Sequence, residues 1–167
     1  MFQKNDYVVY KKNVCIVKYI KQNAKNGKES YLLIPIDDDS LKIEIPTENA
    51  NDYIRRIISK TDAEKIISKI PDISPFEIQD EKYIESEYKS YIQAGTYEDF
   101  IKVIKTAYLR NQKRITNKKK LSEKDTHYFE LAEKYLYNEL SIALDLSFDE
   151  TKDYIISKMK GLIEGWN

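Results

Sequence analysis

The stretch that decides the fold of the first part of the chain is "DYVVYKKNVCIVKYIKQNAKNGKESYLLIPIDDDSLKIEI", residues 6–45. It divides into short runs rich in Val, Ile and Tyr, separated by the turn-like segments "KKN", "NAKNGK" and "DDDS". Such runs are typical of β-strands, and Asn26-Gly27 favours a hairpin because both residue types tolerate the positive φ of tight turns. The pattern predicts strands over residues 6–11, 13–22, 29–36 and 41–45.

A fifth run, "YIRRII" at residues 53–58, completes the set. Five short strands within about 55 residues predict a small, strongly bent meander or barrel of the SH3 or Tudor kind. A domain of this size has little interior for a pocket, so we expect it to bind a partner on its surface.

After Ser59 the hydrophobic pattern changes to a helical one. "TDAE" at residues 61–64 predicts a capping box in which Thr61 begins a short helix. The two prolines of "PDISPF", residues 71–76, predict a break in structure. We therefore expect an α+β chain with three parts: a Tudor-like β-domain with a short trailing helix over residues 1–70, a linker over 71–79, and a compact all-α domain over 80–167.

Four helices are expected in the all-α domain: one over residues 80–93, one from Thr96, one capped by Ser122 and one begun by "SFDE" at 147–150. The second of these helices has a clear apolar face. That face carries Phe100, Val103, Ile104, Ala107 and Tyr108, and the opposite face carries Lys102, Lys105, Leu109 and Lys113.

The charge of the chain is balanced overall but strongly segmented. There are 28 Lys and Arg against 28 Asp and Glu, yet residues 96–120 hold 8 basic and 2 acidic side chains. A local basic excess is either a solvated helix end or a surface that neutralises nucleic-acid phosphates. The pattern alone leaves both interpretations open.

The sequence offers few residues for catalysis or for metal binding. Cys15 stands alone in the apolar run "VCIV", which is typical of a buried thiol, and His127 has no second His or Cys near it. The four glycines are scattered, so no phosphate-binding loop is predicted. We expect a protein that is not an enzyme and has no metal or cofactor, located in the cytoplasm because no apolar segment suits a membrane span or signal peptide.

Several segments, in the same order along the chain, resemble the CarD/CdnL family of bacterial transcription regulators. They are "FQKNDYVVY", "YLLIPIDDDSLKIEIPTENA", "ISKTDAEKII" and "LSEKDTHYFELAEKYLYNELSIAL". The resemblance implies that the β-domain docks on the β subunit of RNA polymerase through a strand edge. The residues that it implies for this contact are Leu32, Lys42, Glu44 and Pro46.

The resemblance also implies that the helical domain contacts promoter DNA and stabilises the open complex, with basic residues on phosphates and a tryptophan in the minor groove. This chain departs from that pattern, because Glu81 stands near the tryptophan position and Tyr83 is the nearest aromatic residue. The loop after the second helix is in turn longer and more basic than in the family. The predicted DNA-binding residues are Lys102, Lys105, Arg110, Lys113, Arg114, Lys118, Lys119, Lys120 and Tyr83.

Two alternatives stay open at this point. The missing tryptophan favours an adaptor that binds polymerase or another protein without touching DNA. An exposed strand edge allows a strand-swapped dimer in place of the expected monomer.

Overall fold

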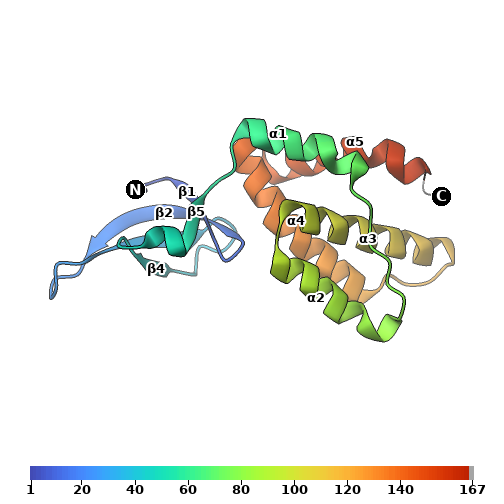
Figure 1. Cartoon of the computed structure of the whole chain (residues 1–167), viewed down its shortest axis with the longest axis horizontal. Coiled ribbons are helices and arrows are strands. Elements are labelled where there is room, and N and C mark those ends of the chain that lie inside the picture. Colours follow the sequence, from blue (N-terminus) through green and yellow to red (C-terminus); the bar gives the residue numbers. More distant parts are fainter. Residues whose placement is uncertain (166–167) are drawn as a thin grey trace. The chain divides into compact units, whose positions relative to one another are not determined.

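The structure is a computed structural model that describes the backbone of residues 1–165 and the side chains of residues 1–159. It divides between Ile58 and Ser59 into an N-terminal unit built on a sheet, called here the sheet unit, and a C-terminal unit of helices, called here the helical unit (Figure 1). The α+β fold class is confirmed. The division lies before the short helix, whereas the sequence analysis placed that helix with the β-domain.

The sheet unit contains the five predicted strands. They are β1 (Tyr7–Tyr10), β2 (Asn13–Gln22), β3 (Glu29–Pro35), β4 (Ile43–Pro46) and β5 (Ile54–Arg56), with the short helix η1 (Ala50–Asp52) before β5. All neighbours pair antiparallel, in the order β4-β3-β2-β1-β5. The strands β4 and β5 are therefore the two edges of the sheet.

The hairpin between β2 and β3 turns where the sequence indicated. Gly27 has a φ of 69° and donates its N–H to the carbonyl of Asn23 at 2.9 Å, while the Asn23 N–H bonds to Lys28 O at 2.8 Å. Because the positive φ is readily adopted only without a Cβ, glycine suits this position.

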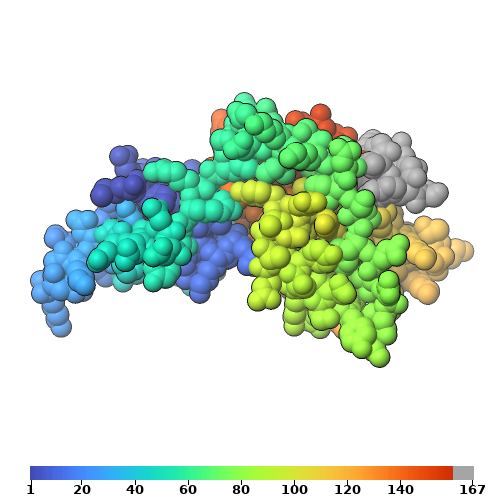
Figure 2. Space-filling model, viewed as in Figure 1, coloured from blue at the N-terminus to red at the C-terminus, as the bar shows by residue number. Residues whose placement is uncertain are grey.

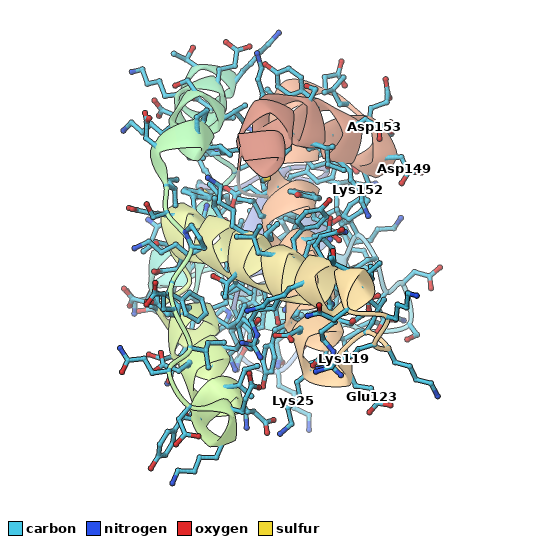
Figure 3. The ribbon with its side chains drawn as sticks, turned by 90° about the vertical axis from the view of Figure 1, so that its right-hand side faces the viewer. Lys25, Lys119, Glu123, Asp149, Lys152 and Asp153 are labelled. Atoms are coloured by element: carbon cyan, nitrogen blue, oxygen red, sulfur yellow. The ribbon has the colours of Figure 1, made fainter. Side chains whose placement is uncertain are left out.

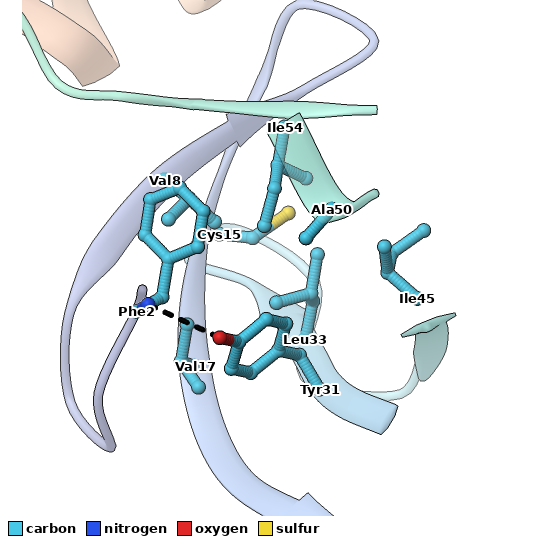
Figure 4. Packing of buried hydrophobic residues seen from close by; sticks show 9 residues of the cluster. All are labelled: Phe2, Val8, Cys15, Val17, Tyr31, Leu33, Ile45, Ala50 and Ile54. Atoms are coloured by element: carbon cyan, nitrogen blue, oxygen red, sulfur yellow. Dashed lines mark hydrogen bonds between the residues drawn. The ribbon is translucent and has the colours of Figure 1, made fainter. Parts of the chain in front are cut away.

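The interior of the sheet unit is apolar and includes Cys15 (Figure 4). Alternate residues of β3, Tyr31 and Leu33, point into it, as expected from the two-residue period of a strand. The Tyr31 hydroxyl accepts the Phe2 N–H at 3.1 Å, and the two rings meet edge to face with centroids 5.8 Å apart. Burial raises the pKa of Cys15 to about 11, which suits a packing role for this thiol.

The helical unit contains α1 (Lys60–Lys69), η2 (Ile70–Asp72), η3 (Glu81–Tyr83), α2 (Ile84–Ala94), α3 (Tyr97–Thr116), α4 (Glu123–Leu144) and α5 (Phe148–Gly165). Ser122 caps α4 by accepting the Asp125 N–H at 3.2 Å. Ser147 and Glu150 form the predicted capping box of α5, with bonds of 3.0 and 3.1 Å. The prediction of a Thr61 cap is wrong, because Ser59 accepts the Asp62 N–H at 3.1 Å and α1 begins at Lys60.

The segment after η2, which the sequence analysis treated as a linker, is packed on the helical unit. It crosses from α1 to the start of α2 along the surface of the unit (Figures 1 and 2). The ring of Phe76 stacks on Tyr91 with centroids 4.2 Å apart, and the Phe76 N–H bonds to Thr106 Oγ1 at 3.0 Å. Pro71 lies within η2, and Pro75 lies in the irregular segment that follows it.

None of the helices within residues 1–165 combines the length and the apolar character that a membrane span requires. The described residues also lack any group of three His, Cys, Asp or Glu side chains placed to hold a metal ion.

Candidate functional site

Strand β4 leaves one of its sides open. Within the described part of the chain it pairs with β3 only. The Thr47 N–H bonds to Glu29 O at 3.1 Å, and the register aligns Ile45 with Tyr31 and Glu44 with Leu32. Because antiparallel pairs alternate between bonded and non-bonded, Ile45 exchanges hydrogen bonds with β3 while the N–H and C=O of Glu44 face outward.

Three of the four residues predicted to bind polymerase lie at this edge. Lys42, Glu44 and Pro46 are exposed on or beside β4, and Glu44 Oε1 pairs with Lys21 Nζ at 3.0 Å. Leu32 differs, since its side chain is only 4% exposed. It lies opposite Glu44 in the register, and its burial leaves little side-chain surface for a partner. Leu41, an exposed apolar residue two positions before β4, was not singled out from the sequence.

The predicted basic surface of α3 is interrupted by Lys105. The prediction that this residue lies on an exposed face is wrong, because its side chain is 2% exposed. Its ammonium donates to the carbonyls of Ile70 and Ile73, the second at 2.6 Å. Burial lowers the pKa of Lys105 to about 8. Lys105 therefore holds the segment after η2 against α3 and has no surface for a phosphate.

Arg110 is engaged by carboxylates from two other elements. Its Nη2 donates to both oxygens of Glu81, at 2.6 and 2.8 Å, and its Nε donates to Asp125 Oδ1 at 3.1 Å. Asp125 is completely buried and also accepts the Tyr88 hydroxyl at 2.5 Å. Burial opposes the charge of Arg110, but the hydrogen bonds to Glu81 and the charge of Asp125 raise its pKa.

The cluster of Glu81, Arg110, Asp125 and Tyr88 fills the place where the family resemblance implied a tryptophan. Burial, followed by the bond to Asp125, raises the pKa of Tyr88, so this hydroxyl remains a donor. Tyr83 lies beside the cluster, is 55% exposed, and has the Lys82 ammonium 5.1 Å from its ring centroid. An acidic, internally bonded cluster therefore stands where an apolar wedge was expected.

Apart from Lys102, the remaining predicted cations lie at the C-terminal end of α3 and in residues 117–120. We call this end of α3 and residues 117–120 together the basic loop. Lys113, Lys118, Lys119 and Lys120 are exposed. Arg114 Nε donates to the carbonyl of Lys120 at 2.7 Å, and the Lys119 N–H bonds to Arg114 O at 2.8 Å, so the loop is folded back on the helix. Figure 3 labels Lys119 of this loop and Glu123, the first residue of α4.

Two observations limit how the basic loop is interpreted. Cations near a helix C-terminus are favoured by the helix dipole, so a structural role alone accounts for Lys113 and Arg114. Lys102 lies near the N-terminus of α3, half-buried, with its Nζ 3.8 Å from Glu98 Oε1. Of the predicted basic residues, Lys113 and the three consecutive lysines 118–120 are the exposed ones.

Comparison with known proteins bears on the sheet unit. Residues 2–58 match the family described as the CarD-like/TRCF RID domain. The match covers 57 of the 167 residues and does not extend to the helical unit. The matched range ends at Ile58, where the structure divides the chain, so the CarD-like RNA polymerase-interacting domain is the sheet unit. A search of curated proteins finds no match to the chain.

Proposed function

We propose that this protein, which carries a CarD-like domain, is a transcription regulator that binds the β subunit of RNA polymerase through β4 and stabilises promoter open complexes through sequence-nonspecific DNA contacts of its helical unit. The observation that carries the proposal is the coincidence of the CarD-like domain, residues 2–58, with a folded unit whose edge strand is open. The CarD family consists of non-enzymatic transcription factors, and the proposed action is likewise binding alone.

The open edge supplies the physical basis for binding polymerase. An exposed strand can extend a partner's sheet, with main-chain hydrogen bonds giving affinity and alternate side chains giving specificity. The outward N–H and C=O of Glu44 are available for such bonds, and Pro46, which has no N–H, limits pairing at the end of β4. The exposed Lys42 and Glu44 side chains would set the choice of partner.

The basic loop supplies the proposed DNA contacts. Lys118, Lys119 and Lys120 are consecutive and exposed, and Lys102, Lys113 and Arg114 extend the positive charge along α3. Lysines that neutralise phosphates act without reading base sequence. Lys105 and Arg110 are left out of the proposed interface because their charges are used within the helical unit.

A second candidate function is an adaptor that binds polymerase without touching DNA. The specific observation in its favour is the pairing of Arg110 with Glu81 near the expected wedge position. This cluster neutralises a cation of α3 and adds no apolar side chain for insertion between bases.

The two functions are separated by binding assays on the full-length chain. We expect the protein to bind the polymerase β subunit and, in addition, to bind forked promoter DNA with an affinity that falls steeply with salt. If the protein binds polymerase but shows no salt-dependent binding to the DNA, the adaptor function is favoured.

The role of β4 is tested with two substitutions at one residue. Glu44→Ala removes the side chain and its ion pair with Lys21, whereas Glu44→Pro also removes the outward N–H. We expect the proline variant to lose polymerase binding by at least about tenfold more than the alanine variant, while circular dichroism shows both folded. Equal losses in the two variants would contradict pairing through the β4 backbone.

A further inference from the structure

A pocket of about 480 Å³ lies between α3, α4 and α5. Its walls are mainly apolar and include Ile104, Ile115, Phe129, Tyr137, Ile156 and Met159. Ile115, Leu121 and Ile156 expose much of their surface at its margin. Pockets of this size with apolar walls and a few polar groups are typical of sites for small molecules.

Glu133 of α4 gives this pocket a polar anchor. The side chain is 5% exposed, and its Oε2 is buried without a hydrogen-bond partner among the described residues. The nearest cation is Lys152, labelled in Figure 3, which reaches from α5 and places its Nζ 3.5 Å from this oxygen. That separation gives an ion pair but exceeds the usual length of an N–H···O bond.

The charges around Glu133 favour a cation. Glu130 lines the same pocket, and of the two lysines that line it only Lys152 acts on the Glu133 carboxylate. Lys105 also lines the pocket, but its ammonium donates to the carbonyls of Ile70 and Ile73. Burial raises the pKa of Glu133, Lys152 lowers it, and Glu130 raises it further. An added cation with N–H donors would oppose the effects of burial and of Glu130.

From this arrangement we propose that the pocket binds a small amphipathic amine, with its ammonium paired with the Glu133 carboxylate and its hydrocarbon body packed against the apolar residues of α3, α4 and α5. A carboxylate-bearing ligand of the same shape would meet Glu130 and Glu133 as like charges. A neutral alcohol would fill the same volume but bring only a single neutral donor. This site is independent of the proposed polymerase and DNA contacts, because none of the residues proposed for those contacts lines it.

The test uses three probes that share one carbon skeleton: phenylbutylamine, phenylbutanol and phenylbutyrate. Binding to the full-length chain is followed by NMR chemical-shift changes, which also locate the site. We expect the amine to bind about tenfold more tightly than the alcohol, the carboxylate to bind most weakly, and the shifts to centre on the pocket residues.

Substitution of Glu133 decides whether the carboxylate is responsible. Glu133→Gln should abolish the preference for the amine over the alcohol, whereas Glu123→Gln, which removes a charge from an exposed position of α4 outside the pocket, should leave it intact. Thermal unfolding of both variants checks that they are folded. No binding of any probe, equal binding of amine and alcohol to the parent, or a preference retained in Glu133→Gln would overturn the proposal.

Discussion

The sheet unit and the helical unit treat their polar groups in opposite ways. The sheet unit leaves the outward backbone groups of β4 unpaired with any other strand of the described chain. The helical unit instead turns two of its predicted DNA-binding cations inward, Lys105 onto backbone carbonyls and Arg110 onto Glu81 and Asp125. The comparison shows that the open hydrogen-bonding capacity of an edge follows from topology, whereas the density of basic residues in a sequence overstates the charge available to a partner.

The largest expected loss of stability comes from removing Asp125, the buried acceptor of the helical unit. Asp125→Ala leaves the Arg110 guanidinium and the Tyr88 hydroxyl without their buried acceptor, and should lower the free energy of unfolding by about 3–5 kcal/mol. Urea unfolding of the full chain measures this loss. The matched control, Glu81→Gln, alters the exposed partner of the same arginine and should cost less than about 1 kcal/mol. Equal losses would show that Arg110 is not anchored by the buried carboxylate.

The next effect concerns Lys105. Lys105→Met removes the donor to two carbonyls, so we expect a loss of about 1–3 kcal/mol in unfolding free energy. The pH dependence gives a second signature. The folded pKa of about 8 lies below the value of 10.5 for the unfolded chain, so the unfolded state binds more protons between these values and this group makes stability rise with pH there. That contribution should be missing in the methionine variant. An unchanged pH profile would contradict a charged, buried Lys105 at neutral pH.

The basic loop tests whether the helical unit has any charge left for DNA. Changing Lys118, Lys119 and Lys120 together to Ala should lower affinity for promoter complexes about tenfold, and should reduce the salt slope by up to about 3. Fluorescence anisotropy at several salt concentrations measures both quantities. The matched control changes the exposed lysines of α1, Lys60, Lys65 and Lys69, to Ala. Equal slopes for the parent and the loop variant would remove the loop from the interface.

The smallest expected effect comes from releasing Arg110 at its exposed side. Glu81→Gln adds one net positive charge to the helical unit and frees Nη2 from its carboxylate, so DNA affinity at low salt should rise by a factor of about 2–5. The same titration as for the loop variant detects the change. No rise would mean that DNA does not approach this end of α3, which favours the adaptor.

The sequence was sufficient to predict those strands and helix starts that depend on local patterns. The alternation of apolar residues and the Asn26-Gly27 turn located the five strands, and Ser122 and Ser147 located two helix starts. At α1 the same reasoning named Thr61 as the cap, whereas Ser59, which also stands three residues before an acidic residue, caps the helix.

Long-range contacts explain the remaining differences. The helical period of α3 places Lys105 opposite Phe100, but it cannot show that the segment after η2 covers that side of the helix. Arg110 likewise meets Asp125 and Glu81, which are 15 and 29 residues away in sequence. Partners so distant leave no periodic signal, so the basic face of α3 looked more open than it is.

The most direct test of the account is hydrogen–deuterium exchange of the full-length chain, alone and with the β lobe of RNA polymerase. The Ile45 N–H is bonded to β3 in both states, whereas the outward Glu44 N–H acquires a partner only in the complex. We predict slowed exchange at Glu44 on adding the β lobe, with little change at Ile45. Unchanged exchange at Glu44 in a complex that demonstrably forms would contradict polymerase binding through the open edge of β4.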